Sequence, residues 1–581
     1  MIDNIEEIGY DKIDLRALEI KPQWNIQWYN QNDEYSEEDI EDEMIRIIAE
    51  TEDNNYSEAI SNHFTWSTYY HLSPIRQNVV NWYPFKEGAE ILEIGCELGA
   101  VTEVLCERCE KVTVVELSKR RATATLLRCR KKENLEVIVG NFKDIKFEKK
   151  FDYITLLGVL EYQGCYTDGE GVNPFENFLK KIKSLLKPDG KLIVAIENKY
   201  GLKYWCGARE DHTGLPFDGI NQYELGNKKA KTFSRDELKN LLMKSGFSNT
   251  YFYYPLPDYK LPLHIYSDKH LPKDAKGWKP YYVPDSSTLI ADESKLYEDI
   301  IKNNVFEFFA NSFLVECSID SREMGEIEFA ILHSDRQEKY RVGTTINKKK
   351  EVHCIPLNSA SKEHLLHLYE NSLKMVGRGL NIVPLKLQGD KLEMSFMGYP
   401  TMEELILDAY RNKEINKIEE LFDTLLKQIE MGAIEAKKEN NILYELNIDK
   451  GDSKIFYGKI LKTAYIDMLP RNCFMKDGLL FWFDQEWKLE NIPSKYILYR
   501  AIHFLYMENP WIDEVLERRE LIKRYNIQDC EESFYTLEVM FYSSVVVDKN
   551  TLFAKNTFGN GGLKEQLTNL LNFFDKRNGG K

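Results

Sequence analysis

The chain has 581 residues, of which 43% are hydrophobic and 29% charged, so it is too long for one ordinary core and has the composition of a globular protein. Its formal net charge of −17 argues against a general nucleic-acid binder, which requires a basic surface. No apolar run reaches the length of a membrane span, and the N-terminus lacks a basic start and an apolar core. We therefore expect a cytoplasmic protein of two or three domains with no integral membrane segment.

The first 60 residues are expected to form an acidic N-terminal arm. Residues 32–55 are rich in Asp and Glu and poor in Gly and Pro, which is typical of a solvated helix or a flexible segment. A second change of composition occurs at residues 263–300, where Pro272, Pro280 and Pro284 interrupt any regular element. We interpret this stretch as a linker between a domain at 61–262 and another at 301–581.

Residues 91–99 (ILEIGCELG) predict a buried strand that ends in a glycine-rich turn. Gly95 and Gly99 would let the backbone approach a ligand at the start of a helix, where free N–H groups face the bound molecule. Residues 112–116 (VTVVE) predict a second strand, and its last residue, Glu116, has the spacing of a carboxylate that binds a ribose diol. The alternative is that both glycines are ordinary turn residues and that Glu93 is a solvated acid.

Two further strands are expected at residues 135–139 and 151–157, and helical segments separate all four. This order predicts βαβ units and a parallel sheet. The agreement of four strand ends favours a cofactor site over isolated turns. The candidate cofactor-binding residues lie at these strand ends and in the segment before the sheet: Glu93, Gly95, Gly99, Glu116, Asn141, Phe142, Gly158, Tyr70 and Arg76.

The E-x-G-x-x-x-G spacing of Glu93 to Gly99, together with the turn at 185–192 (LLKPDGKL), resembles the class I S-adenosylmethionine (SAM)-dependent methyltransferases over about residues 60–260. The resemblance implies a Rossmann-like α/β domain that binds SAM. One departure is Glu97, where the family usually has glycine. It adds a carboxylate beside the amino-acid end of the cofactor.

Aromatic and polar residues gather in three segments, at 69–78, 197–212 and 253–259. The second segment follows the fifth strand, and sheets of this kind bind ligands beyond the carboxyl ends of their strands. Aromatic rings with carboxylates and amides suit a sugar acceptor, although half-buried packing of the tyrosines is an alternative interpretation.

His212, flanked by Asp211, is the candidate base for a hydroxyl acceptor, with the carboxylate fixing the tautomer of the ring. A phosphate acceptor is already anionic and requires no base. In that case Arg76, Lys199 or Lys203 would serve as its charge partner. The sequence leaves both acceptors open, and His212 could also be a histidine without a chemical role.

In the second half, Asp467 and Asn472 stand in D-x-x-x-x-N spacing, and Asp484 follows after a turn and a short strand. This layout resembles the small-molecule and lipopolysaccharide kinases of the protein-kinase-like fold. The resemblance implies an α+β two-lobed domain, with an N-lobe at about 301–397 and a C-lobe at about 398–581.

In such a domain Asp467 would orient the acceptor hydroxyl, while Asn472 and Asp484 would hold Mg²⁺ against ATP. The expected third strand, residues 351–356, lacks the kinase lysine, and no Gly-rich phosphate loop is evident. A capped turn with a hairpin, or an inactive kinase-like domain, are the alternatives.

The two halves together resemble the bifunctional kinase-methyltransferase chain terminators of O-antigens. This implies methyl transfer to a sugar hydroxyl or sugar phosphate in surface-polysaccharide biosynthesis, a second ATP-dependent sugar kinase activity, and glycosyltransferases as partners. Two alternatives stay open: the C-terminal half is a non-catalytic module that binds a glycan or a partner, or the chain is a small-molecule methyltransferase with an unrelated C-terminal domain.

Overall fold

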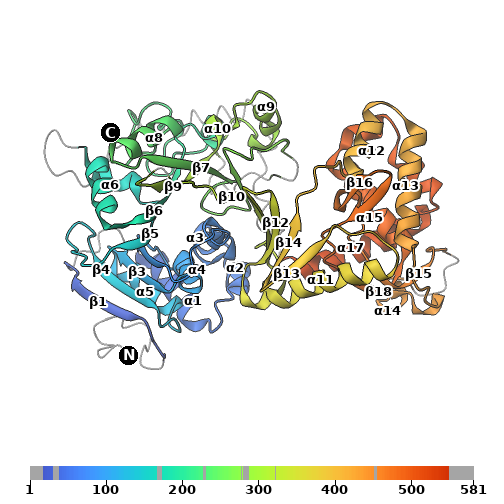
Figure 1. The fold of residues 1–581 in the computed structure, drawn as a ribbon, viewed down its shortest axis with the longest axis horizontal. Helices are drawn as coiled ribbons and strands as arrows, with labels where there is room; N and C mark the ends of the chain where they lie inside the picture. The colour runs from blue at the N-terminus through green and yellow to red at the C-terminus, as the bar shows by residue number, and fades with distance from the viewer. Residues whose placement is uncertain are drawn as a thin grey trace. The chain divides into compact units, whose positions relative to one another are not determined.

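The computed structural model describes residues 18–30, 38–165, 173–226, 230–275, 278, 287–320, 322–449 and 455–547. The chain divides into two compact units, a first unit that runs to Ser334 and a second unit from Asp335 to Val547 (Figure 1). Among the described residues, no helix is both long and apolar enough to cross a membrane.

The first unit is built on a mixed sheet with the strand order β1-β4-β3-β2-β5-β6-β9-β7-β8-β10. The strands are β1 (Gln23–Trp28), β2 (Glu90–Ile94), β3 (Lys111–Glu116), β4 (Leu135–Gly140), β5 (Phe151–Leu157), β6 (Leu186–Glu197), β7 (Asn249–Leu256), β8 (His264–Ser267), β9 (Ser312–Ser318) and β10 (Ile327–Leu332). Neighbours from β1 to β6 run parallel, and those from β6 to β10 run antiparallel. The predicted Rossmann-like fold is confirmed.

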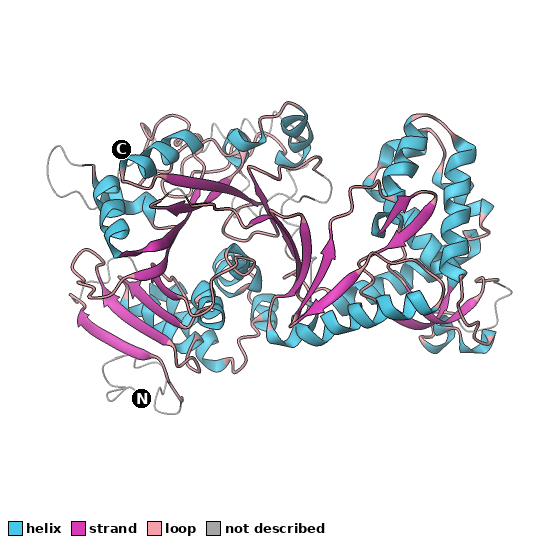
Figure 2. Ribbon diagram, in the orientation of Figure 1, coloured by secondary structure: helices cyan, strands magenta, loops and turns pink. Residues whose placement is uncertain are grey.

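Helices lie on both faces of this sheet (Figure 2). The α-helices of the first unit are α1 (Glu38–Glu50), α2 (Ser57–Asn62), α3 (Trp66–Leu72), α4 (Ala100–Arg108), α5 (Lys119–Arg128), α6 (Pro174–Leu185), α7 (Leu202–Trp205), α8 (Arg235–Lys244), α9 (Tyr297–Lys302) and α10 (Phe306–Phe309). Every residue of β5 is buried, as expected for a central strand that is covered on both sides.

The N-terminal residues that the structure describes belong to the fold rather than to a free arm. Strand β1 pairs with β4 and extends the sheet. Helix α1 packs on α5, with Met44, Ile45 and Ile48 buried. Two of its acids also face α5, where Glu41 Oε1 lies 2.7 Å from Arg121 Nε and Asp42 pairs with Arg120. The acidic composition therefore partly reflects ion pairs within the fold. Residues 1–17 and 31–37 lie outside the described residues.

The first unit also extends beyond the boundary expected at residue 262. Strand β9 lies between β6 and β7 and pairs with both, and all seven of its residues are buried. Part of the expected linker, residues 287–300, includes helical turns of the same unit. Strands β9 and β10, expected in a kinase-like N-lobe, thus complete the sheet of the first unit, because β9 fills the gap between two strands that are distant in sequence.

The second unit combines a small antiparallel sheet with a helical part. The sheet has the order β11-β12-β14-β13 and consists of β11 (Val342–Asn347), β12 (Glu351–Pro356), β13 (Leu385–Gln388) and β14 (Lys391–Ser395). Helix α11 (Lys362–Gly377) packs against β12 and β14. Leu365, Leu368 and Leu392 lie in the core between them.

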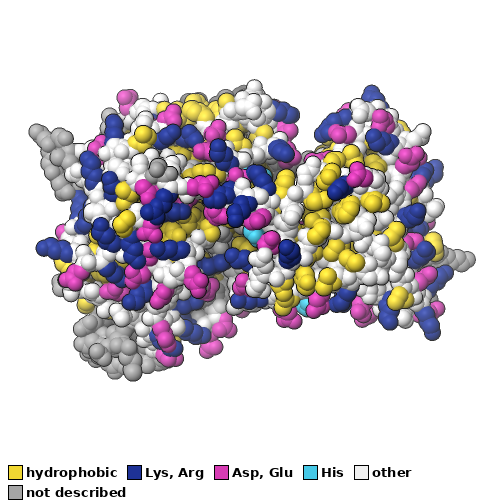
Figure 3. Space-filling view, viewed as in Figure 1, with side chains coloured by type: hydrophobic (Ala, Val, Ile, Leu, Met, Phe, Trp, Pro, Cys, Tyr) yellow, Lys and Arg dark blue, Asp and Glu magenta, His cyan; other side chains and the backbone are white. Residues whose placement is uncertain are grey.

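The helical part has a separate core. Its helices are α12 (Met402–Arg411), α13 (Ile415–Glu430), α14 (Ile442–Glu445), α15 (Ser494–Glu508), α16 (Arg518–Arg524) and α17 (Glu531–Val545). Two hairpin-like pairs complete it, β15 (Ile460–Tyr465) with β18 (Lys488–Pro493) and β16 (Cys473–Lys476) with β17 (Leu479–Trp482). Figure 3 shows hydrophobic side chains gathered on one face of this unit. The second unit thus has a sheet with one helix followed by a helical part, and the two-lobed kinase-like fold stays a prediction.

Candidate active site

The glycine-rich turn after β2 has the backbone conformation that the sequence predicted. Gly95 and Gly99 have φ angles of +75° and +78°, and Gly99 is the N-cap of α4. A Cβ atom on Gly95 would lie 2.6 Å from Val159 Cγ2. Both the φ angle and the missing space therefore require glycine at position 95.

Two predicted carboxylates lie at the ends of β2 and β3. Glu93 Oε2 accepts a hydrogen bond of 2.6 Å from Thr102 Oγ1, and burial raises the pKa of Glu93 to about 8. Glu116 accepts hydrogen bonds from the backbone N–H groups of Cys96 (3.1 Å) and Ser118 (3.0 Å). Glu116 is thus held directly against the glycine turn, and its oxygens keep lone pairs for a further donor.

Glu97 occupies the turn with a left-handed backbone, at a φ of +50°. Its Oε1 accepts a 2.8 Å hydrogen bond from Tyr70 Oη, and its Oε2 lies 3.7 Å from Arg76 Nη2 and 4.0 Å from His71 Nδ1. Although burial opposes it, the charges of Arg76 and His71 hold the pKa of Glu97 below its usual value. Tyr70 and Arg76 were both predicted to bind the cofactor. In the structure they position Glu97, the residue that stands where the family usually has glycine.

A cavity of about 280 Å³ opens beside this turn. It is lined by residues of α1, of α3, of the glycine turn and of the segments after β5 and β6: Ile40, Glu41, Met44, Trp66, Ser67, Tyr70, His71, Glu97, Leu98, Arg121, Gly158, Glu161, Tyr162, Glu197, Asp211, His212, Tyr259 and Lys260. Tyr70 and Gly158 are the predicted cofactor residues among them. The turn thus forms one wall of a cavity whose other wall holds polar side chains.

Of the predicted cofactor residues that do not line this cavity, Phe142 and Asn141 are engaged by the fold itself. Phe142 is a core residue, packed against Phe178 and covered by Lys181 Nζ at 4.5 Å from its ring centre. Asn141 Oδ1 accepts a hydrogen bond from the backbone N–H of Lys143 at 3.0 Å. Both residues follow β4, as the family pattern requires. However, the Phe142 ring is part of the hydrophobic core, and the Asn141 side chain is hydrogen-bonded within a turn.

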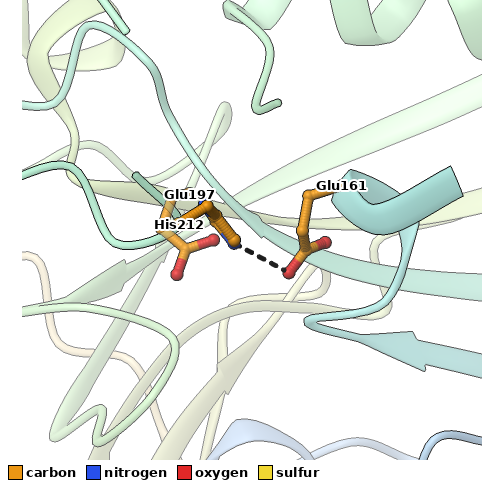
Figure 4. Close-up of side chains that lie close together, drawn as sticks. All are labelled: Glu161, Glu197 and His212. Carbon is orange, nitrogen blue, oxygen red and sulfur yellow. Dashed lines mark ion pairs between the residues drawn. The ribbon is translucent and has the colours of Figure 1, made fainter. Parts of the chain in front are cut away.

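Three buried side chains form what we call the acidic cluster, Glu161, Glu197 and His212 (Figure 4). Their ligand atoms lie within 4.8 Å of one another, and His212 Nε2 is 3.6 Å from Glu161 Oε1. Glu161 follows β5 and Glu197 ends β6, two neighbouring parallel strands. The sequence placed Glu197 in the acceptor segment 197–212, but neither glutamate was predicted to have a chemical role. The signal that would have found them is an acid at each of two adjacent strand ends.

The carboxylate that holds His212 is Glu210 and not the predicted Asp211. Glu210 Oε1 lies 2.9 Å from His212 Nδ1, and Glu210 Oε2 accepts the backbone N–H of His212 at 2.8 Å. Asp211 turns the other way and pairs with Lys203 (3.1 Å), Lys260 and Tyr204. Burial opposes protonation, but Glu161 and Glu210 hold the pKa of His212 well above its ordinary value.

The cations considered as phosphate partners are all engaged. Lys199 Nζ lies 2.7 Å from Glu237, Lys203 Nζ lies 2.8 Å from Asp258, and Arg76 Nη1 donates to the backbone oxygen of Tyr259 at 3.2 Å. A phosphate in the cavity would compete with these partners and face the acidic cluster. The geometry therefore disfavours the phosphate alternative.

The tyrosines of segment 253–259 divide into core and cavity residues. Tyr253 and Tyr254 are fully buried in β7, where Tyr253 packs against Trp82. Tyr259 lines the cavity, and its Oη donates to Glu197 Oε1 at 3.3 Å. For Tyr253 and Tyr254 the packing interpretation is correct.

In the second unit, Asp467, Asn472 and Asp484 are brought together around one loop. Asn472 Nδ2 donates to the backbone oxygen of Asp467 at 3.1 Å, and Asp467 Oδ2 accepts the backbone N–H of Trp487 at 3.1 Å. Burial, followed by repulsion from neighbouring acids, raises the pKa of Asp484 to about 8, and burial raises that of Asp467 to about 7.

A third acid of this loop, Glu486, was not predicted. Its Oε2 lies 2.5 Å from Arg336 Nη1 and 3.2 Å from His364 Nε2 on α11. Arg500 Nη1 lies 3.7 Å from Asp467 Oδ1. Two of the three acids thus have cationic partners within the unit.

The sequence is similar to known methyltransferases. The profile of a methyltransferase domain family matches residues 69–251, within the first unit. Nodulation protein S of Bradyrhizobium diazoefficiens is 30% identical over 151 residues, which cover 26% of this chain and 69% of the relative. The ubiquinone biosynthesis O-methyltransferase of Pelagibacter ubique is 25% identical over 180 residues, which cover 29% of this chain and 71% of the relative.

A solved structure of the N-methyltransferase NodS from Bradyrhizobium japonicum with S-adenosylhomocysteine is 19% identical, with a TM-score of 0.20, and covers 28% of this chain and 74% of that chain. The fold, the glycine turn and the sequence matches together define the class, and the chain belongs to the SAM-dependent methyltransferases. Its curated relatives include an O-methyltransferase by name.

Proposed function

We propose that the first unit transfers the methyl group of SAM to a sugar, at a hydroxyl or amino group that lies against the acidic cluster. The observation that carries this proposal is the single cavity, in which Glu97 and Leu98 of the glycine turn face the same space as Glu161, Glu197 and His212. SAM, when bound, supplies a methyl group on a positively charged sulfur.

The residues beside the turn fit the cofactor. Space for a close approach exists because Gly95 and Gly158 carry no side chain, and a Cβ on Gly158 would lie 2.8 Å from Tyr259 Oη. Glu116 would bind the ribose hydroxyls from the end of β3. Arg121, which lines the cavity, and Arg76 would interact with the carboxylate of the cofactor in competition with Glu97.

The opposite wall suits an uncharged or cationic acceptor better than an anion. Trp66 and Tyr162 offer aromatic surfaces for stacking on a sugar ring, and Tyr162 is 39% exposed. Glu161 and Glu197 can accept hydrogen bonds from hydroxyl or ammonium groups. The name of the N-methyltransferase NodS supports an amine as the alternative to a hydroxyl. A sugar phosphate is the least favoured of the three acceptors.

Methyl transfer is an in-line displacement, so the protein acts mainly by aligning the nucleophile and by taking up its proton. The acidic cluster is the group that would receive this proton. In the wider proposal the acceptor belongs to surface-polysaccharide biosynthesis in the cytoplasm, with glycosyltransferases as partners.

The test is the variant His212→Gln, assayed by transfer of labelled methyl from SAM to a panel of sugars and amino sugars. We expect turnover to fall by about 100-fold or more with the SAM affinity unchanged. His63→Gln, an exposed histidine of the same unit, is the control and should retain activity. Unchanged turnover in His212→Gln would contradict the assignment of the acceptor wall.

For the second unit we infer a separate role as a nucleotide-binding, kinase-like domain. The observation in favour is that Asn472 and Asp467 are locked together beside Asp484, whose raised pKa makes a divalent cation a suitable partner. The pairing of Glu486 with Arg336 and His364 favours the alternative, a non-catalytic module that binds a glycan or a partner.

Calorimetric titration of the full chain with ATP, with and without Mg²⁺, separates these roles. Binding that requires Mg²⁺ and is lost in Asp484→Ala supports a kinase-like site with Asp467 at the acceptor hydroxyl. No binding, or binding that Asp484→Ala leaves unchanged, supports the non-catalytic module.

A further inference from the structure

We propose that Glu161, Glu197 and His212 bind one divalent transition-metal cation in the wall of the cavity. The proposal goes beyond the methyl transfer described above, and it holds whether or not the acceptor is a sugar. It rests on four features of the acidic cluster: its geometry, its unpaired oxygens, the orientation of its imidazole and its charge.

The three ligand atoms come from separate segments and meet at one point. Glu161 follows β5, Glu197 ends β6, and His212 lies in the loop after α7, yet their ligand atoms lie within 4.8 Å of one another. Each glutamate is 1% exposed, and the His212 side chain is 4% exposed. In the described part of the chain, no other set of three or more His, Cys, Asp and Glu side chains meets this condition.

Both glutamates have an oxygen that no donor satisfies. Glu161 Oε2 and Glu197 Oε2 are buried and lack a hydrogen-bond partner within the described residues. An unsatisfied buried acceptor costs roughly 1–3 kcal/mol, and more when it is charged. A metal ion between the two carboxylates would give both a positive partner. The other oxygen of Glu197 already accepts from Lys260 Nζ at 2.6 Å, which orients the carboxylate.

The imidazole is held as a metal-binding histidine is held. Metal-ligating histidines donate their second ring N–H to a carboxylate or a carbonyl, which fixes the tautomer and the ring orientation. Here Glu210 occupies that position at His212 Nδ1 (2.9 Å), and its second oxygen is tied to the backbone N–H groups of His212 and Thr213, each at 2.8 Å. The Nε2 atom is left facing Glu161.

The charges around the cluster leave a negative excess. Among the described residues, ion pairs join the carboxylates of Glu161, Glu197, Glu210, Asp211 and Asp258 to His212 and to two lysines, Lys203 and Lys260. A proton on His212 offsets one negative charge. A divalent cation in its place would offset two, and buried carboxylates require such compensation.

The ligand set indicates the kind of ion. One imidazole nitrogen with carboxylate oxygens suits Zn²⁺, Mn²⁺ or Fe²⁺, whereas Ca²⁺ and Mg²⁺ prefer oxygen ligands alone. Three protein ligands leave coordination positions open toward the cavity, as in catalytic metal sites. An acceptor hydroxyl bound there would lose its proton more readily.

The test is a titration of the full chain with Mn²⁺ after removal of metals by a chelator, with SAM and acceptor absent, followed by electron paramagnetic resonance. We expect one Mn²⁺ per chain. Glu161→Gln and His212→Gln should remove it, and Glu210→Gln should weaken binding by roughly 10- to 100-fold, because it removes the carboxylate that orients the imidazole.

Two controls make the outcome decisive. Each variant is first checked for unchanged SAM binding, which shows that the unit is folded, and Glu110→Gln, an exposed glutamate of the same unit, should bind Mn²⁺ like the wild type. Asp484→Ala should also keep the bound ion, since it alters only the second unit.

Two results would overturn the proposal: no bound Mn²⁺ in the wild type, or binding that survives in both Glu161→Gln and His212→Gln. Neither result bears on SAM binding or on methyl transfer, which are measured separately. A failure of the methyl-transfer assay likewise leaves the Mn²⁺ titration intact.

Discussion

Each unit of the chain brings together acids that its sequence places at strand or loop ends, but the two clusters differ in their partners. In the first unit, Glu161 and Glu197 each keep a buried oxygen without a donor. In the second unit, Glu486 is paired with Arg336 and His364. An acidic motif therefore does not define a binding site by itself. What separates a site open to a ligand from one satisfied by its own chain is whether the fold supplies the counter-charges.

The acids of the first unit also lie in surroundings that suit a ligand better than those of the second unit. The first cluster lines a cavity that also contains the glycine turn, so its ligand and the cofactor would share one space. The acids of the second unit lie near strand β12. This strand carries Val352, His353 and Cys354 where the kinase resemblance would require a lysine. Chemical function is therefore better supported in the first unit than in the second.

The largest expected effect is on SAM binding, when the same glycine-to-arginine substitution is made in each unit. Gly95→Arg should abolish SAM binding, because its Cβ would lie 2.6 Å from Val159 Cγ2 at a φ of +75°. Gly478→Arg, at a φ of +76° with nothing within 4 Å, should leave SAM binding unchanged. Calorimetry with SAM measures both. Equal affinity in Gly95→Arg and wild type would remove the turn from the site.

The next effect comes from removing a positive partner of Glu486 in the second unit, which would leave this acid less compensated, like Glu161 and Glu197 in the first unit. Arg336→Ala leaves Glu486, which is 6% exposed, with one partner fewer, so we expect the second unit to lose about 3 kcal/mol of unfolding free energy in urea. Arg411→Ala removes an exposed partner of Asp408 in the same unit and should cost less than about 1 kcal/mol. A similar loss in both variants would mean that the Arg336–Glu486 pair does not stabilise the unit.

A smaller effect concerns the ribose carboxylate of the first unit. Glu116→Ala should weaken SAM binding by about 2 kcal/mol, or roughly 30-fold, since hydrogen bonds to charged groups contribute about 1.5–3 kcal/mol. Glu110→Ala, an exposed acid next to the same strand, is the matched control. An unchanged dissociation constant in Glu116→Ala would indicate that Glu116 only braces the turn through Cys96 and Ser118.

The smallest effect is a dependence on pH. Burial raises the pKa of Glu93 from 4.5 to about 8, so the folded state favours its neutral form. This contribution to stability is complete below the unfolded pKa and is lost as the pH rises through about 8. Glu93→Gln, which imitates the neutral form, should resemble the wild type in stability near pH 4.5 and should be more stable than the wild type by pH 9. Urea unfolding at the two pH values checks this, and a constant difference would contradict it.

Much of the first unit could be predicted because its signals are local. Strands β2 to β5 are short apolar runs that end in an acid or a glycine, and these patterns located the turn, Glu116 and Gly158. Strand β9 could not be assigned in this way. Its place between β6 and β7 depends on pairing with two strands that both lie more than 60 positions earlier in the sequence.

Side-chain direction was the other limit. Glu210 and Asp211 are both two or fewer positions from His212, and sequence spacing cannot tell which one faces the ring. The fold decides it, because Lys203, Lys260 and Tyr204 draw Asp211 away. Likewise, Phe142 has the position of a cofactor residue, but the core between β4 and α6 takes its ring.

The most direct test of the account is a crystal structure of the full chain with S-adenosylhomocysteine. The account predicts that the ligand lies along the turn from Gly95 to Gly99, with its ribose at Glu116 and its sulfur facing Glu161 and His212 across the cavity. A ligand bound elsewhere, or one whose sulfur faces away from the acidic cluster, would contradict the assignment of this cavity as the site of methyl transfer.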